Sequence, residues 1–135
     1  MCTILLPIKP EYSNKIIEET KLYEYRKKRC KRKVNKILIY CTSPIKKIVA
    51  EVEVVDVLLN NPTLLWDITK EHAGISKKKY EEYYCNSNLA VAYKLGKVSV
   101  YDEPIDLRDI GINYHPQSYV YLDWSIINCY TIVSC

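Results

Sequence analysis

From Ile48 to Leu59 apolar and polar side chains alternate, a pattern that predicts a β-strand with one buried face. Shorter apolar runs recur along the chain, and proline, glycine or clusters of polar residues separate them. We therefore expect further strands at 3–8, 21–27, 34–41, 89–95, 97–101 and 118–122, with 89–95 and 97–101 forming a hairpin across Gly96. Such a series of short strands favours a small β-rich domain.

Two or three helices are expected between these strands. Pro10 and Glu11 suit the start of a helix that runs to Glu18. A polar loop at 60–63 precedes a second helix that ends near Gly74, and Ser76 is placed to cap a third. The second helix carries the apolar side chains Leu64, Leu65, Trp66 and Ile68, and the third is expected to turn Tyr80, Tyr83 and Tyr84 inward. A dinucleotide-binding sheet is not expected, because no glycine-rich turn joins a strand to a helix.

The composition is that of one folded domain. The chain has 135 residues, of which 48% are hydrophobic and 27% charged. No apolar run reaches the roughly 18 residues of a membrane span, and no signal peptide is recognisable, so a cytoplasmic protein without membrane contact is expected. We assign residues 1–124 to the domain and 125–135 to an apolar tail, which is an extra strand, an oligomer contact or a frayed end. The sequence leaves the oligomeric state open.

The cysteines and histidines do not suggest a metal centre. Six cysteines are scattered along the chain, and none forms the closely spaced pair that zinc sites use. The two histidines, His72 and His115, are far apart in the sequence. Free thiols are expected, with no metal and no cofactor.

Positive charge is concentrated in one short segment. Between positions 21 and 36 the chain holds nine lysines and arginines against the single acidic residue Glu24. We interpret the segment as a basic hairpin that contacts phosphates, because clustered cations mark a surface for polyanions. A solubilising hairpin tip is the alternative. The cations are Lys21, Arg26, Lys27, Lys28, Arg29, Lys31, Arg32, Lys33 and Lys36.

Several short sequence motifs, in their order along the chain, resemble those of the ASCH domain in the PUA-like superfamily. The resemblance rests on residues 4–10, the helix to position 18, the motif at 19–26, the turn at 39–44 and the strand at 116–121. The motif of that family reads Gly-x-Lys-x-x-Glu-x-Arg, and Glu19 stands in place of its glycine. Glycine suits a helix end with positive φ, where glutamate is strained. The resemblance implies an α+β fold, a small mixed PUA-like β-barrel with flanking helices, and a groove that recognises RNA or modified nucleosides.

Lys21, Glu24 and Arg26 are the expected recognition residues of the groove. An arginine can donate two bonds to a phosphate or a base edge, and a glutamate can accept from an exocyclic amino group. Glu24 and Arg26 can instead simply pair with each other. Thr42 and Ser43 can offer hydroxyl and backbone N–H groups to a phosphate, although a turn before proline explains them equally well. Tyr23, Tyr25 and Tyr40 are candidates for base stacking, with core packing as the alternative, and Trp66 is expected in the core.

The predicted function is therefore nucleic-acid binding, and a protein-interaction or purely structural role is a further alternative. RNA is the preferred partner, and DNA or a free nucleoside or nucleotide is the alternative ligand. An enzymatic alternative comes from the branch of the family that hydrolyses N4-acetylcytidine with a lysine, a threonine and a glutamate. Lys21 matches that lysine, but Glu24 stands where the threonine is expected, and the second glutamate has no secure match near Glu71. Lys21 and Glu24 are the catalytic candidates only if the protein is an enzyme, with Lys21 as a general base.

Overall fold

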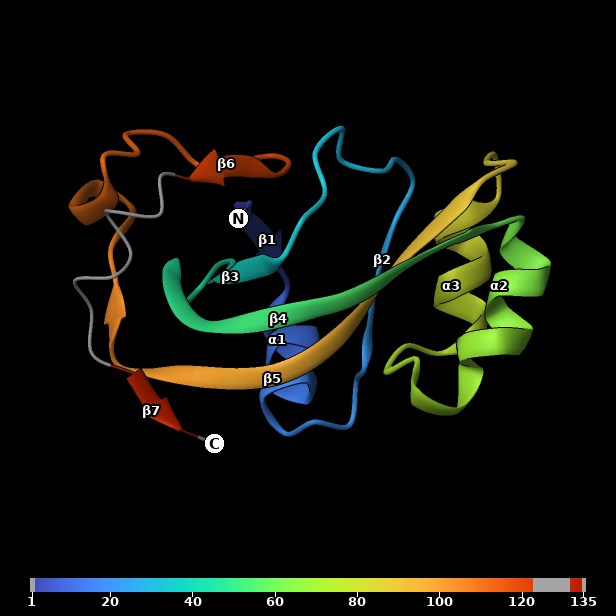
Figure 1. The fold of residues 1–135 in the computed structure, drawn as a ribbon, viewed down its shortest axis with the longest axis horizontal. Coiled ribbons are helices and arrows are strands. Elements are labelled where there is room, and N and C mark those ends of the chain that lie inside the picture. Colours follow the sequence, from blue (N-terminus) through green and yellow to red (C-terminus); the bar gives the residue numbers. More distant parts are fainter. Residues whose placement is uncertain (1, 123–131, 135) are drawn as a thin grey trace.

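The computed structural model describes residues 2–122 and 132–134, which form a mixed sheet flanked by helices (Figure 1). The strands pair in the order β2-β5-β4-β3-β1-β6, and β7 pairs with β5 outside this path. Only β1 and β3 are parallel among the described pairs, and the other pairs are antiparallel. The fold class expected from the sequence, α+β with flanking helices, is confirmed, although the described strands form an open path rather than a closed ring.

The middle of the sheet holds the most buried part of the chain. β1 (Thr3–Ile8) lies between β3 (Lys36–Cys41) and β6 (Val120–Leu122), and its apolar run TILLPI is buried almost throughout. α1 (Pro10–Ile17) follows directly and places Ile16 in the same core as Ile4 and Ile37. A strand with partners on both sides and a helix nearby needs a nearly continuous apolar sequence, as this one has.

Two long strands cross the molecule and carry the remaining helices at one end (Figure 1). β4 (Lys47–Asn60) pairs with β5 (Ala90–Ile105) along most of their lengths. The predicted hairpin across Gly96 is wrong, because β5 continues through this position as one strand. A Cβ on Gly96 would lie 2.7 Å from Val55 Cγ1, so this glycine serves the close approach of the two strands rather than a turn.

Two helices pack together where β4 ends and β5 begins. Asn61 caps α2 (Pro62–Thr69) and Ser76 caps α3 (Lys77–Tyr84), each by accepting a bond from a backbone N–H. Tyr80 and Tyr84 are buried as expected, but Tyr83 is 36% exposed. In an eight-residue helix only one stripe faces the sheet, and Tyr83 lies outside it.

The remaining connections are short. A 3₁₀ turn at Lys70–His72 follows α2, and another at Leu107–Ile110 follows β5. β7 (Ile132–Ser134) pairs with residues 99–101 of β5, on the strand that also holds β2 at positions 91–94. Residues 125–131 of the predicted tail lie outside the described residues. No described helix is long and apolar enough to span a membrane.

The basic segment is not a hairpin. β2 (Tyr23–Arg26) pairs with β5, whereas β3 pairs with β1 and β4, so these two consecutive strands are not neighbours. Residues 27–33 form a connection between them that we call the basic loop. Cys30 anchors it, because this residue is buried and its N–H donates to the Tyr93 hydroxyl at 3.0 Å. The cations on either side are exposed.

Candidate nucleic-acid groove

A groove of about 570 Å³ lies between α1, β2 and α3. Its walls come from segments far apart in the sequence: the end of β1, the start of α1, the strand β2 and one side of α3. The ion pair between Lys79 and Glu11, at 3.4 Å, links α3 to α1 at this site. The lining residues used below are Pro7, Glu11, Tyr12, Lys21, Glu24, Tyr25, Arg26, Lys79, Glu82 and Tyr83.

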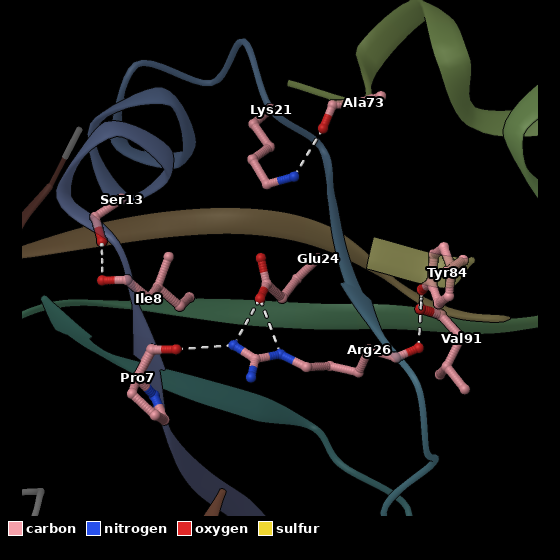
Figure 2. Close-up of polar contacts among 9 residues, drawn as sticks. All are labelled: Pro7, Ile8, Ser13, Lys21, Glu24, Arg26, Ala73, Tyr84 and Val91. Atoms are coloured by element: carbon pink, nitrogen blue, oxygen red, sulfur yellow. Dashed lines mark hydrogen bonds and ion pairs between the residues drawn. The ribbon is translucent and has the colours of Figure 1, made fainter. Parts of the chain in front are cut away.

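Glu24 and Arg26 form an ion pair in the groove (Figure 2). Arg26 donates to Oε2 of Glu24 through Nε at 3.0 Å and through Nη2 at 2.8 Å. Nη2 also donates to the carbonyl of Pro7 at 2.8 Å, which ties β2 to the end of β1. The predicted alternative, that these two side chains pair with each other, is therefore correct. Within the described part of the chain no hydrogen bond reaches Oε1 of Glu24, whose carboxylate lies between Lys21 and Arg26 (Figure 2).

Lys21 lies in the same groove and is only 3% exposed. Its Nζ donates to the carbonyl of Ala73 at 2.7 Å and lies 4.8 Å from the ring centre of Tyr25 and 5.4 Å from that of Tyr12. Burial lowers the pKa of Lys21 to about 8, the nearby carboxylate of Glu24 acts in the opposite direction, and Lys15 and Arg26 lower it further. This amine is therefore far easier to deprotonate than an ordinary lysine.

The end of α1 brings Lys21 to this position. Alternation along a strand would place Lys21 on the face opposite Glu24, but β2 begins only at Tyr23. Glu19 has a φ of 63°, and the N–H groups of Glu19 and Thr20 bond the carbonyls of Ile16 and Lys15. These bonds form a Schellman motif, so the left-handed helix end survives with glutamate where glycine is usual. The chain then reverses and directs Lys21 into the groove.

Gly74 holds the other side of the Lys21 stem. It adopts a φ of 66°, and a Cβ at this position would lie 2.4 Å from Lys21 Cβ. The sequence predicted Gly74 as the end of a helix and gave no role in the groove to it, and Glu71, near which a second glutamate was sought, is exposed. The scarcity of glycine, three in the whole chain, is the signal that could have indicated a special backbone position here.

The cations of the basic loop lie at or beyond the rim of the groove. Lys27 follows Arg26 directly, and its Nζ lies 4.7 Å from the ring centre of Tyr83, which lines the groove. Arg32 lies 4.3 Å from the ring centre of Tyr121 on β6. Lys36 is different, because it forms an ion pair with the buried Glu51 at 2.8 Å. The exposed loop cations are Lys27, Lys28, Arg29, Lys31, Arg32 and Lys33.

The other predicted contacts lie away from the groove lining or in the core. Thr42 is half-buried and Ser43 exposed in the turn after β3, where the N–H of Thr42 bonds the carbonyl of Ile8. Tyr40 is buried at 3% exposure, and Tyr25 is buried in the aromatic cluster of α2 and α3 while also lining the groove. Trp66 is partly buried against the same cluster.

Metal-ligand chemistry is not indicated by the described residues, in which no group of three or more histidine, cysteine or acidic side chains could hold an ion. The four described cysteines are free thiols: Cys2, Cys30, Cys41 and Cys85. The groove instead offers a lysine amine, a carboxylate and an arginine, together with the faces of tyrosine rings.

The model of the ASCH domain matches residues 6–99, a span that contains the groove residues from Pro7 to Tyr83. The chain belongs to the ASCH domain family. The structure is similar to the crystal structure of ASCH from Zymomonas mobilis, with a TM-score of 0.87 over 98% of both chains and 22% identity. A variant of that protein gives a TM-score of 0.86 over 94% of both chains. At this identity, the likeness shows the fold alone.

Curated relatives are longer proteins from Ureaplasma parvum serovar 3. The chain is 30% identical over 121 residues to ATP synthase subunit alpha, covering 89% of this chain but 15% of that protein. It is 33% identical over 90 residues to large ribosomal subunit protein uL22, covering 67% of this chain and 29% of that one. The ASCH chain described here thus spans under a third of the curated relatives that it matches.

Proposed function

We propose that this ASCH domain binds single-stranded RNA, with one unpaired nucleotide in the groove and the neighbouring phosphates on the basic loop. The observation that carries the proposal is the Glu24–Arg26 pair, which holds a nearly buried carboxylate in a groove bordered by exposed cations. A cavity of about 570 Å³ falls within the range of sites for small organic ligands, so it has room for a base and its sugar.

The carboxylate would select the base. Arg26 donates to Oε2 of Glu24 through both Nε and Nη2, which fixes the side chain, and no hydrogen bond among the described residues reaches Oε1 of this groove-lining carboxylate. A carboxylate oxygen accepts hydrogen bonds, so it favours bases with an exocyclic amino group, such as cytosine or adenine, over uracil. The rings of Tyr12 and Tyr25 line the same groove and offer apolar surface to the base and sugar.

The basic loop would supply affinity without sequence preference. Its cations are exposed, and Lys27 lies against Tyr83 at the edge of the groove, so a strand leaving the groove meets the loop at once. Neutralising phosphates releases counterions, and for single strands the logarithm of the affinity falls with log salt by about 0.7 per contact. Unpaired RNA fits this arrangement, because its bases are free to leave the stack.

Fluorescence anisotropy of labelled single-stranded RNA at about 50 to 200 mM salt tests the proposal. The Lys28→Gln/Arg29→Gln double variant should reduce the slope of log affinity against log salt by about 1.4, the value for two phosphate contacts. A Lys70→Gln/Lys97→Gln double variant, which removes two exposed lysines outside the groove and the loop, should keep the slope of the wild type. Equal slopes for both double variants, or no RNA binding at low salt, would contradict the proposal.

A second measurement tests the groove separately from the loop. The wild type should bind oligocytidine and oligoadenosine more tightly than oligouridine, and Glu24→Gln should reduce this preference, because an amide presents a donor as well as an acceptor. If Glu24→Gln leaves the preference unchanged, the groove does not read the base. Duplex DNA and free cytidine serve as competitors, and stronger competition by either would replace single-stranded RNA as the partner.

A further inference from the structure

The amine of Lys21 is placed like a nucleophile rather than like a surface charge. Its stem is held by Gly74 and its Nζ by the carbonyl of Ala73, with the ring of Tyr25 alongside. The same side chain lines the groove, so the amine stands where a ligand would lie. Figure 2 shows Nζ directed to the carbonyl of Ala73, with the carboxylate of Glu24 between the Lys21 side chain and Arg26.

Three features of this surrounding favour the neutral amine. The side chain is removed from water, and two further cations, Lys15 and Arg26, act on it. Desolvation beside other cations is a known way of making a lysine react with carbonyl carbons. With a pKa of about 8, roughly one Lys21 amine in ten is neutral at pH 7. An ordinary lysine is neutral far more rarely.

We propose that Lys21 forms an imine with the C1′ aldehyde of an abasic nucleotide in a bound RNA strand. This inference rests on the proposed function, since the strand must first occupy the groove and the basic loop. An abasic nucleotide has lost its base and carries an aldehyde at C1′ in its open-chain form. That carbon is the atom from which the base would extend into the groove, so binding brings it toward Lys21.

The chemistry balances without a further reactant. The lone pair of the neutral amine attacks C1′ and forms the C–N bond, while the carbonyl π electrons move to oxygen. One N–H proton passes to that oxygen and gives a carbinolamine. The second N–H proton and the hydroxyl group then leave as water, and the C=N bond forms. Glu24 lines the groove beside Lys21, and its Oε1, which receives no hydrogen bond among the described residues, can relay these protons.

Borohydride trapping tests the proposal on the full chain. The protein is mixed with a single-stranded RNA that contains one abasic ribose, and sodium cyanoborohydride reduces any imine to a stable secondary amine. Mass spectrometry of the digested protein should locate the adduct on Lys21. Lys21→Met removes the amine but keeps an apolar stem, and it should reduce the adduct at least tenfold, whereas Lys97→Met, an exposed lysine outside the groove, should leave the yield unchanged.

The controls separate this inference from the proposed function. Anisotropy with the intact strand of the same sequence measures binding alone, and circular dichroism checks that Lys21→Met folds. If the intact strand binds but no adduct forms on Lys21, the imine proposal fails and RNA binding stands. An adduct spread over the exposed lysines of the loop would also overturn it, and so would an adduct with ribose 5-phosphate but none with the strand. If neither strand binds, the proposed function fails as well.

Discussion

Arg26 places two hydrogen bonds on a single oxygen of Glu24, Oε2, and none among the described residues reaches the other oxygen, Oε1. The two residues are separated by one position on β2, and strand geometry puts both side chains on the same face. The pair is unequal, because the Glu24 side chain is 8% exposed and that of Arg26 is 25% exposed. The buried partner therefore depends on the more exposed one for its counter-charge.

Replacing Arg26 should destabilise the protein more than replacing both members of the pair. Arg26→Gln leaves the carboxylate of Glu24 nearly buried without its guanidinium, and we expect a loss of about 2 kcal/mol in the free energy of unfolding. The Arg26→Gln/Glu24→Gln double variant removes the uncompensated charge and should recover about half of the loss. Urea unfolding at pH 7 measures both. Additive losses would show that the pair is not coupled.

Gly74→Ala should disturb the groove as well as the fold. The new Cβ would meet the Lys21 stem at 2.4 Å next to its backbone, where the lysine cannot swing aside. Gly111→Ala is a matched control, because Gly111 also has a positive φ, 82°, but has no atom within 4 Å of a new Cβ. We expect the control to lose about 1 kcal/mol from backbone strain and Gly74→Ala about 2 kcal/mol more. Thermal unfolding and RNA anisotropy compare the two; equal losses would mean that the contact is not rigid.

The stability should rise with pH above about 8 because of Lys21. Its pKa is about 8 in the folded protein against an ordinary value of 10.5, so the unfolded chain binds more protons between these values. Charged Lys21 thus costs the folded state about 3 kcal/mol below pH 8, and this cost fades as pH rises through that window. Above pH 10 the buried tyrosines oppose the trend, since burial raises the pKa of Tyr25 and Tyr84.

Urea unfolding at intervals from pH 7 to pH 10 follows this dependence. Lys21→Met should flatten the curve below pH 10, and Lys97→Met should not alter its shape. Glu24→Gln should shift the rise to lower pH, because the carboxylate of Glu24 is the group that raises the pKa of Lys21. An identical slope in the wild type and Lys21→Met would refute the assignment of this titration to Lys21.

Restoring glycine at position 19 should stabilise the domain. Glu19 adopts a φ of 63°, a conformation that costs a residue with a Cβ about 1 kcal/mol relative to glycine. Glu19→Gly should therefore raise the free energy of unfolding by about that amount. Glu18→Gly is the matched control, because Glu18 has an ordinary φ of −74° and glycine there should lower stability. A stabilising effect of both variants, or of neither, would contradict the argument.

Much of the fold was predictable because it depends on local patterns. The alternation at 48–59, the apolar run at 3–8 and the caps at Asn61 and Ser76 all correspond to observed elements. The failures share a cause. The local pattern predicts a turn at Gly96 and a hairpin in the basic segment. Both predictions fail because the strands there pair with segments that are distant in the sequence.

The sequence by itself determined the residue types and spacing of the site: Lys21, Glu24 and Arg26 in one motif, followed by a run of exposed cations. Only the tertiary structure decided that Lys21 joins Glu24 in one groove, because the contacts that place it come from the end of α1 and from Ala73 and Gly74. The contacts of Lys21 with Ala73 and Gly74 span more than fifty positions of sequence. Desolvation, which lowers the pKa of this lysine, exists only once these distant segments have packed around it.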